Sequence, residues 1–406
     1  MSGPELITLG CRLNIAESKA IRAALGGADD LVIVNSCAVT NEAVVETRKA
    51  IRRAARRRPD ARIVVTGCAS EIDRAAFEGM AEVDRVVANI AKTDPALYFD
   101  RTLPVMTAPI RGGDAGADGG HARAFIAVQN GCDHSCTFCI IPQGRGPSRS
   151  LPAGAVVEAV RAAVEAGRRE VVLTGVDVTA YGADLPGWPT LGMLVERVLR
   201  LVPDLERLRL SSLDPHEMDE RLIALFESEP RLMPHLHLSL QAGHDMILKR
   251  MKRRHMRAEA VALVARIRAK RPDLAIGADV IAGFPTETEA MFADSLALIA
   301  DCGIVHPHIF PFSPRTGTPA ARMPQLPRDV VRDRAGRLRE AAAAHRMAWL
   351  RSRVGATAKV LVERDGVTGH AEDFARVRIA RGGVAGAIHS VRFTSVEEDH
   401  LVGVMA

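Results

Sequence analysis

The chain has 406 residues, of which 47% are hydrophobic and 25% are charged, and this composition is typical of soluble globular proteins rather than disordered or fibrous ones. A chain of this length exceeds the size at which one hydrophobic core keeps growing, so we expect two or three domains. It has no run of about 18 uncharged apolar residues, and its first residues, MSGPELITLG, lack the layout of a signal peptide. We therefore expect a cytoplasmic protein without a membrane partner.

The formal net charge is +5, which is too small to indicate nucleic-acid binding without further evidence. Basic residues gather in three segments, 48–58, 249–257 and 328–353. Each segment fits a surface that faces phosphate groups, and each taken alone fits better a helix face exposed to solvent. The charge pattern leaves both interpretations open.

The first hundred residues alternate short β-rich apolar runs with helical patterns. The runs ELITLG, LVIVNS and RIVVTG are each followed closely by a cysteine, namely Cys11, Cys37 and Cys68, and helical patterns follow at 15–25, at 42–57 and from residue 71. The cysteines are 26 and 31 residues apart, the spacing of successive βαβ crossovers of about 30 residues. Because ligands bind beyond the carboxyl ends of parallel strands, we expect these thiols to converge on one point. The alternative is three unrelated buried thiols, which the repeated placement disfavours.

A linker and two further regions follow. Residues 102–122 lose periodicity and fill with Gly, Ala, Pro and Asp, as linkers do. From residue 124 onward, six candidate strands alternate with helices, which implies parallel pairing through right-handed crossovers. The strands are expected at 125–129, 171–174, 208–211, 236–240, 276–281 and 308–312, and the helices at 155–166, 191–201, 218–227, 258–269 and 288–300. After an Arg-rich helical stretch at 329–353, short alternating runs predict a small antiparallel β-module.

A second cysteine triplet follows the first strand of the middle region, in QNGCDHSCTFCIIPQGRGPSRS. Cys132, Cys136 and Cys139 have the spacing C-x3-C-x2-C, and three thiolates bind three irons of a four-iron cluster while the fourth iron stays open. A structural zinc would need four Cys or His ligands, and His134 lies in the short x3 span, where it is hard to bend onto the same ion. An electron-transfer cluster would need a fourth cysteine. Seven cysteines in a chain without a leader also argue against a disulfide framework, and we interpret Cys302, outside both triplets, as a core thiol.

This loop resembles the signature of the radical S-adenosylmethionine superfamily, whose core is a partial (β/α)6 barrel. The segments ITLGCRLN, VNSCAVT, GCAS, TGVDVTAYG, RLSSLDP, HLHLSLQAG, VIAGFPTETE and FPFSPRTGTPA follow in order, and together with the loop they resemble the methylthiotransferase family over nearly the whole chain. The resemblance implies an α/β fold with an open parallel N-terminal methylthiotransferase domain at 1–101, a linker at 102–122, a radical SAM domain at 123–354 and a TRAM-like RNA-binding domain at 355–406.

The resemblance also implies the cofactors, which are two [4Fe-4S] clusters and S-adenosylmethionine. Cys11, Cys37 and Cys68 would hold the cluster that carries the sulfur or methylthio group. The second triplet would hold the cluster at which S-adenosylmethionine is cleaved, and the resulting radical would remove a hydrogen from the substrate. Both triplets would therefore be catalytic and would face one substrate pocket.

Several residues match positions where such enzymes hold S-adenosylmethionine. Gly175 and Asp177 match the grip on the methionine amino group, where a carboxylate would hydrogen-bond the cation, although Asp stands here where Asn or Glu would be expected. Ser211, Ser212 and Gln241 are placed to meet the ribose and the carboxylate, or they cap loops. Gly283 lets backbone approach the adenine, or it serves a turn before Pro285.

Other polar residues have two interpretations. His235 and His237 share one face of a strand, and we interpret both as satisfied core histidines. Arg145 and Arg149 follow the cluster loop and either bind substrate phosphate or carboxylate or form structural ion pairs. The C-terminal module has only Phe374 and Phe393 as aromatics, so we expect charge rather than base stacking to hold RNA there.

Branches of the family modify either an adenosine beside the tRNA anticodon or an aspartate of a ribosomal protein. The segments GCRLN, HLHLSLQAG and IFPFSPRTGTPAARMPQ most resemble the N6-threonylcarbamoyladenosine branch, with the isopentenyladenosine branch second. We therefore expect the anticodon stem-loop of tRNA as partner, while the sulfur donor and the electron donor are not indicated. A non-catalytic iron–sulfur RNA-binding protein would leave TGVDV and VIAGFP unexplained.

Overall fold

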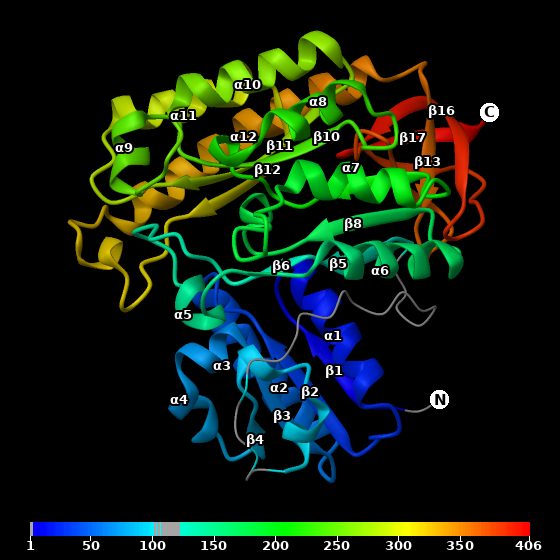
Figure 1. The fold of residues 1–406 in the computed structure, drawn as a ribbon. Coiled ribbons are helices and arrows are strands. Elements are labelled where there is room, and N and C mark those ends of the chain that lie inside the picture. The colour runs from blue at the N-terminus through cyan, green and yellow to red at the C-terminus, as the bar shows by residue number, and fades with distance from the viewer. Residues whose placement is uncertain (1–2, 101–102, 104–105, 107–121) are drawn as a thin grey trace.

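The computed structural model describes residues 3–100, 103, 106 and 122–406. The N-terminal residues form a layer beneath a larger central body, and the C-terminal strands lie against one end of that body (Figure 1). The linker expected at 102–122 lies outside the described residues, apart from positions 103, 106 and 122.

The N-terminal layer is a four-stranded parallel sheet in the order β1-β2-β3-β4. Its strands are β1 Glu5–Thr8, β2 Leu31–Ser36, β3 Arg62–Gly67 and β4 Arg85–Val86, and its helices are α1 Arg12–Ala24, α2 Asn41–Arg57, α3 Cys68–Ile72, α4 Arg74–Glu78 and the 3₁₀ turns η1 Asn89–Ala91 and η2 Pro95–Tyr98. All six residues of β2 are buried, because helices cover both faces of a parallel sheet. The helix expected from residue 71 is two short helices beginning at Cys68, and β4 is too short to have a periodic signal.

The central body contains six parallel strands. They are β5 Ala124–Ala127, β8 Glu170–Thr174 and β9 Arg207–Leu210 in one sheet and β10 His235–Gln241, β11 Ala275–Ala282 and β12 Ile304–Pro311 in the other. Bridges from Leu208 to Leu232 and from Leu213 to Leu238 connect the two sheets. The remaining elements are β6 Gln129–Asn130, β7 Arg149–Ser150, α5 Ile141–Arg145, α6 Ala153–Glu165, α7 Leu191–Leu201, α8 Glu220–Ser228, α9 Asp245–Arg250, α10 Arg257–Lys270, α11 Glu289–Asp301, α12 Arg328–Ser352, η3 Val178–Ala180, η4 Pro215–Glu217 and η5 Pro319–Arg322.

These six strands curl around a common interior, which we call the lumen. The ring of Phe374 is contacted there by Arg123, directly before β5, at 5.6 Å, by Arg209 of β9 at 5.0 Å and by His306 of β12 at 6.0 Å. In a flat sheet, side chains from the first and last strands would be too far apart to contact the same ring. The α/β fold with a partial barrel, which the sequence pattern alone left open, is thereby confirmed.

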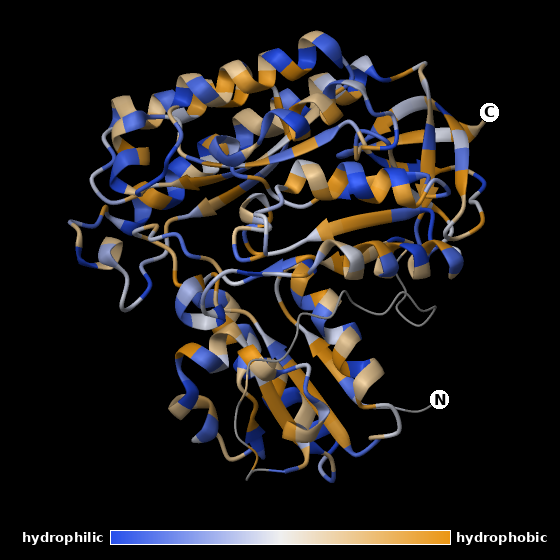
Figure 2. Ribbon diagram, viewed as in Figure 1, coloured by the Kyte–Doolittle hydropathy of each residue, from blue (hydrophilic) through white to orange (hydrophobic). Residues whose placement is uncertain are grey.

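Alternation along the strands separates an apolar outside from a polar lumen. Leu236, Leu238 and Leu240 of β10 join the main hydrophobic core beneath the surrounding helices, whereas His235 and His237 point to the opposite face, as period-two alternation requires. The strands β2, β3 and β8 are predominantly hydrophobic (Figure 2). This polar interior distinguishes the barrel from one that is merely filled by a core.

The C-terminal strands form a closed barrel in the order β13-β14-β15-β17-β16. They are β13 Thr357–Val362, β14 Thr368–Ala371, β15 Arg376–Ile379, β16 Ile388–Glu397 and β17 His400–Met405. The expected antiparallel module is confirmed, with the difference that β15 and β17 pair in parallel. Closure leaves no unpaired edge strand, and Leu350 of α12 packs into the barrel core with Val360 and Phe393.

The module is joined to the lumen by Phe374 and by arginines. The Phe374 ring stacks on His235 at 4.9 Å and on His370 at 4.6 Å, and Arg209 donates to the carbonyl oxygens of Ala371 at 2.9 Å and Glu372 at 2.8 Å. Phe393 is only 1% exposed. Both aromatics of the module are therefore engaged internally, which agrees with a surface that binds by charge.

Most of the basic segments serve ion pairs. On α2, Arg48 pairs with Asp73 at 3.4 Å and Arg52 with Glu82 at 3.8 Å. On α12, Arg334 is buried against Glu287 at 2.9 Å. For such residues the ion pairs favour the interpretation as helix faces with internally paired charges, and phosphate binding by these segments stays a prediction.

None of the helices in the described ranges combines the length and the apolar character needed to cross a bilayer.

Candidate functional site

The N-terminal cysteines meet at one edge of their sheet. Cys11 precedes α1, Cys37 follows β2, and Cys68 begins α3 directly after β3. Gly10 has φ +101°, and a Cβ there would lie 2.8 Å from Cys37 Sγ, so only glycine permits this close approach of the first loop. Burial raises the pKa of the Cys37 thiol, and the neighbouring thiols of Cys68 and Cys11 raise it further. The three strand ends therefore place three thiols around one space.

The central triplet lies in the loop after β6, where polar donors point at its sulfurs. The backbone N–H groups of His134 and Ile141 donate to Cys132 Sγ and Cys139 Sγ, each at 3.4 Å. Arg253 Nη1 lies 3.7 Å from Cys136 Sγ. Donors and cations of this kind stabilise thiolates, which is the form that binds iron.

The same loop is clamped to the segment that follows α9. Thr137 donates from its backbone N–H to Met251 O at 3.1 Å and from Oγ1 to Arg250 O at 2.8 Å. Arg253, which also binds Asp214 at 2.8 Å, is turned inward although it belongs to the basic segment 249–257. The sequence interpretation missed Arg253 and Asp214, because a basic run does not reveal which of its members point inward.

As free thiols, Cys132 and Cys139 would be protonated at neutral pH. Burial raises the pKa of Cys132 to about 12 and that of Cys139 to about 11. A coordinated cation removes the proton from a thiol outright. Three cysteines of one loop, with backbone and guanidinium donors directed at their sulfurs, therefore fit an iron cluster better than they fit three structural cysteines. All seven cysteines of the chain are free of disulfides.

The two triplets face one another across α5. This short helix begins two residues after Cys139, and a Cβ at Gly144 would lie 3.2 Å from Cys68 Cβ. Asn89 donates to both Cys68 Sγ and the carbonyl oxygen of Gly144. Besides burial, the charge of Cys68 is among the causes that raise the pKa of Cys139. The apposition expected from strand-end geometry is thus present.

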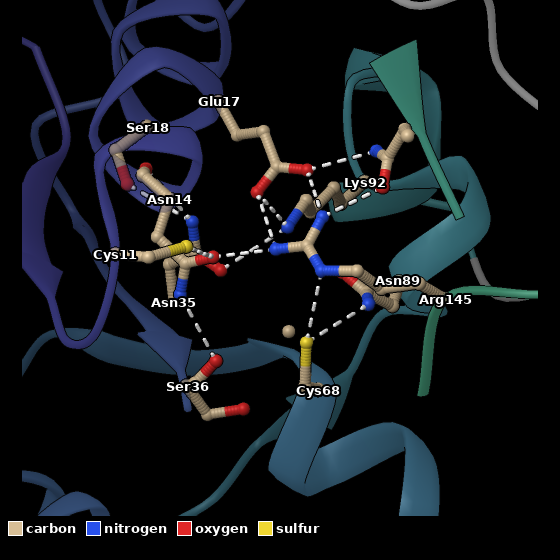
Figure 3. Close-up of polar contacts among 12 residues, drawn as sticks. Cys11, Asn14, Glu17, Ser18, Asn35, Ser36, Cys68, Asn89, Lys92 and Arg145 are labelled. Carbon is tan, nitrogen blue, oxygen red and sulfur yellow. Dashed lines mark hydrogen bonds and ion pairs between the residues drawn. The ribbon is translucent and has the colours of Figure 1, made fainter. Parts of the chain in front are cut away.

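Arg145, at the end of α5, reaches the N-terminal triplet at Cys68 (Figure 3). Its Nε donates to Cys68 Sγ at 3.1 Å, its Nη1 to Glu17 Oε1 at 2.7 Å and its Nη2 to Asn14 Oδ1 at 2.6 Å. The side chain is 3% exposed. The interpretation of Arg145 as a ligand of substrate phosphate is not supported, since its donors are already engaged by α1 and by a cluster thiol.

Glu17 and Lys92 complete this buried network. Lys92 Nζ lies 2.5 Å from Glu17 Oε2. Burial alone would raise the pKa of Glu17, but the cations of Arg145 and Lys92 lower it to about 2. Glu17 is therefore ionised at neutral pH, and its contacts with Arg145 hold α1 onto the end of α5. Arg149, by comparison, lies in β7 with its pKa lowered by burial.

Two of the residues expected at S-adenosylmethionine lie beside the central triplet. Asp177 Oδ2 is 3.6 Å from Cys132 Sγ and 2.6 Å from His134 Nε2. Gly175 approaches β6 so closely that a Cβ would lie 2.8 Å from Gln129 O. Gln129 Oε1 accepts from the backbone N–H groups of Val176 and Asp177 at 3.0 and 2.9 Å. Gln129 thus positions this loop, a role that the sequence interpretation missed.

The other expected contacts lie at strand ends with different surroundings. Ser211 follows β9, and its buried Oγ has no hydrogen-bond partner within the described residues, so it is free for a ligand; Ser212 is half-buried. Gln241 ends β10 with φ +65°. Gly283 has φ +73°, and a Cβ there would lie 2.8 Å from Val331 Cγ2, which favours the turn over an approach to adenine.

Of the two lumen histidines, His235 differs from expectation, whereas His237 is buried and hydrogen-bonded as expected. His235 is buried, but neither ring nitrogen has a hydrogen-bond partner among the described residues, so it is a stacked core residue and not a satisfied one. His237 Nε2 and His308 Nδ1 each lie 3.1 Å from Asp279 Oδ1. The sequence interpretation missed Asp279 and His308, although both face the lumen from neighbouring strands.

Comparison with known proteins identifies relatives for nearly the whole chain. Residues 126–299 match the Radical SAM superfamily, and residues 5–88 match a family described as Uncharacterized protein family UPF0004. Threonylcarbamoyladenosine tRNA methylthiotransferase MtaB of Rickettsia prowazekii is 44% identical, covering 99% of this chain and 97% of that protein. A tRNA-2-methylthio-N(6)-dimethylallyladenosine synthase of Erythrobacter litoralis is 35% identical, covering 88% of this chain and 86% of that protein.

Solved structures share the fold at low identity. The radical S-adenosylmethionine methyltransferase TsrM from Kitasatospora setae, solved with cobalamin and a [4Fe-4S] cluster bound, aligns with a TM-score of 0.53 at 14% identity. The alignment covers 77% of each chain. This likeness concerns the fold alone.

Proposed function

Because this chain belongs to the radical S-adenosylmethionine methylthiotransferase family, we propose that it adds a 2-methylthio group to N6-threonylcarbamoyladenosine beside the anticodon of tRNA, in the cytoplasm. The proposal rests on one structural observation above all, which is the apposition of two thiol triplets across α5 and Arg145. The similarity to the Rickettsia prowazekii enzyme supports the choice of substrate.

Membership of the radical SAM superfamily implies a four-iron cluster and S-adenosylmethionine. We assign that cluster to Cys132, Cys136 and Cys139, and we propose a second four-iron cluster on Cys11, Cys37 and Cys68. When bound, these groups supply the one-electron cleavage of a sulfonium and the sulfur that is transferred. Both triplets leave one iron without a protein thiolate, which is the position that a reaction needs.

The residues of the chain then have separable roles. Asp177 is placed to bind the ammonium group of S-adenosylmethionine through a charge-assisted hydrogen bond. The unpartnered hydroxyl of Ser211, together with Ser212 and Gln241, is assigned to the ribose and carboxylate. Arg145 positions Cys68 by donating from its Nε to the Cys68 sulfur, and it ties the end of α5 to α1 through Glu17.

We assign residues 1–101 to the methylthiotransferase domain, 102–122 to a linker, 123–354 to the radical SAM domain and 355–406 to a TRAM-like domain that holds tRNA. Charge supports this last role, since Arg376, Arg381 and Arg392 are exposed on the closed barrel. Cations on a surface bind the phosphate backbone without regard to sequence. The anticodon stem-loop is the part of tRNA that must reach the triplets.

The substrate is tested by mass spectrometry of tRNA nucleosides from a deletion strain. We expect the methylthio mark to disappear from the threonylcarbamoyl nucleoside and to return when the wild-type gene is restored, but not when a gene with Cys132→Ala is restored. The Erythrobacter litoralis relative makes N6-isopentenyladenosine the second candidate. Loss of the mark from the isopentenyl nucleoside instead would transfer the assignment to that substrate.

A further inference from the structure

The lumen contains a guanidinium that has no carboxylate partner. Arg12, which directly follows Cys11, extends from the start of α1 into the lumen, where its Cζ lies 5.5 Å from the centroid of the Phe374 ring. Arg123 and Arg209 approach the same ring at 5.6 and 5.0 Å. Three guanidinium groups therefore surround one aromatic ring in the lumen.

The carboxylates nearby are already used by other groups. Glu170 pairs with Arg123 and with Arg209, each at 2.9 Å. The charged groups that act on Arg12 are Arg123 and Arg209 on the positive side and Glu170 and Asp279 on the negative side. Two cations and two anions thus act on Arg12. Among the described residues, no carboxylate lies within 4.0 Å of the Arg12 guanidinium. The positive charge of Arg12 is therefore not balanced by a paired carboxylate.

Asp279 is held by two histidines rather than by Arg12. His237 Nε2 and His308 Nδ1 both contact Asp279 Oδ1 at 3.1 Å, and their rings lie 4.6 Å apart. The His308 side chain is 57% exposed. Because its Nδ1 is bound to Asp279, its Nε2 is the nitrogen that remains for another partner.

These residues come from the segments that resemble the threonylcarbamoyl branch. Arg12 lies in GCRLN and His237 in HLHLSLQAG, and His308 directly precedes IFPFSP. The segments are far apart along the chain, yet Arg12, His237 and His308 all neighbour Asp279 in the lumen. Residues from the sequence segments that favour one substrate therefore lie close together in the fold.

We propose that Arg12, with His308 beside it, binds the free carboxylate of the threonylcarbamoyl side chain and so selects the modified adenosine; this inference rests on the proposed function. A guanidinium matches a carboxylate in charge and in bidentate geometry, and an enclosed site strengthens such a pair. An isopentenyl group would leave Arg12 desolvated and unpaired, which disfavours that substrate. Since Arg12 adjoins Cys11, one short segment carries both the sulfur site and the selecting group.

The experiment compares two anticodon stem-loop RNAs that differ in one charge. One carries N6-threonylcarbamoyladenosine, and the other carries its methyl ester, which removes the anion and adds only one methyl group. We expect the reconstituted wild-type enzyme to bind the ester about 10-fold to 100-fold more weakly than the acid, the range of a charge-assisted hydrogen bond. Arg12→Gln is expected to lose a similar factor with the acid and to show no further loss with the ester.

Two control variants separate this role from a structural one. Arg12→Lys is expected to keep part of the preference for the acid that Arg12→Gln loses, because lysine keeps the positive charge but lacks the planar guanidinium that binds a carboxylate with two hydrogen bonds. Arg22→Gln lies on the exposed face of the same helix and is expected to keep the wild-type preference. Iron content and 5′-deoxyadenosine formation without RNA establish that each variant carries both clusters.

The outcomes are decisive in both directions. Equal binding of acid and ester by the wild-type enzyme would overturn the proposal, even if Arg12→Gln did not take up iron. Persistence of the full ester penalty in an iron-replete Arg12→Gln enzyme would overturn it as well. Modification of an isopentenyladenosine stem-loop, with no product from either threonylcarbamoyl RNA, would instead refute the proposed function.

Discussion

The two cysteine triplets are built in different ways. The central triplet lies within one loop, Cys132 to Cys139, whose own backbone N–H groups point at its sulfurs. The N-terminal triplet gathers Cys11, Cys37 and Cys68 from three strand ends. The first arrangement needs only a clamped loop, whereas the second exists only when a parallel sheet has formed. We therefore expect the N-terminal site to be far more sensitive to changes elsewhere in the chain.

The largest expected effects come from removing the thiols themselves. With Cys11, Cys37 and Cys68 changed to alanine, anaerobically reconstituted protein should hold about four irons instead of about eight. It should still form 5′-deoxyadenosine from S-adenosylmethionine but transfer no methylthio group. Alanine at the central triplet should abolish both reactions. Iron analysis and product chromatography measure this, and an unchanged iron content in the first variant would contradict two separate clusters.

The next largest effect is expected at Arg145, which links the end of α5 to Cys68 and to Glu17 of α1. Arg145→Ala removes a buried partner of Glu17 and the donor to Cys68 Sγ, and breaking a buried pair costs about 3 kcal/mol or more. Denaturant unfolding should show this loss, and iron analysis should show that the N-terminal site empties before the central one.

Arg74→Ala is the matched control for Arg145. Arg74 is partly exposed, pairs with Glu78 at 3.3 Å and Glu71 at 3.7 Å, and donates to Val86 O at 3.2 Å. Its removal should lower the free energy of unfolding by about 1 kcal/mol, less than the removal of Arg145. If Arg145→Ala behaved like this control, the buried network would not be what joins the two sites.

A smaller and more local effect is expected from Gly10→Ala. The backbone φ of +101° strains any side chain by about 1–3 kcal/mol, and the new methyl group would collide with Cys37 Sγ. The N-terminal iron should become labile to a chelator while 5′-deoxyadenosine formation continues. Gly26 lies just after the C-terminal end of α1, and no atom lies within 4 Å of its Cβ position. Gly26→Ala should therefore have neither effect.

The smallest effect is expected in the clamp of the central loop. Thr137→Val removes the hydrogen bond to Arg250 O but keeps the backbone bond to Met251 O, so the free energy of unfolding should fall by only about 1 kcal/mol. The rate of 5′-deoxyadenosine formation should change little. A loss of central iron as large as that caused by a cysteine substitution would show that this loop is not self-sufficient.

The sequence by itself determined the elements whose signals are local. Strand and helix periodicity, the C-x3-C-x2-C spacing and the position of cysteines after strands predicted the order of the strands and the convergence of the N-terminal thiols. Even there, short elements escaped, because β4 and the two helices after β3 span too few residues for a period to show.

The tertiary structure alone decided which charged residues belong to the site. Arg145 binds Glu17 and Cys68 rather than substrate, Arg253 turns from a basic run toward a cluster thiol, and Arg12 enters the lumen. These contacts join segments far apart in the chain, and the direction of a charged side chain follows from which carboxylates the fold brings within reach. No local pattern carries that information, because it arises only when burial makes each unpaired charge costly.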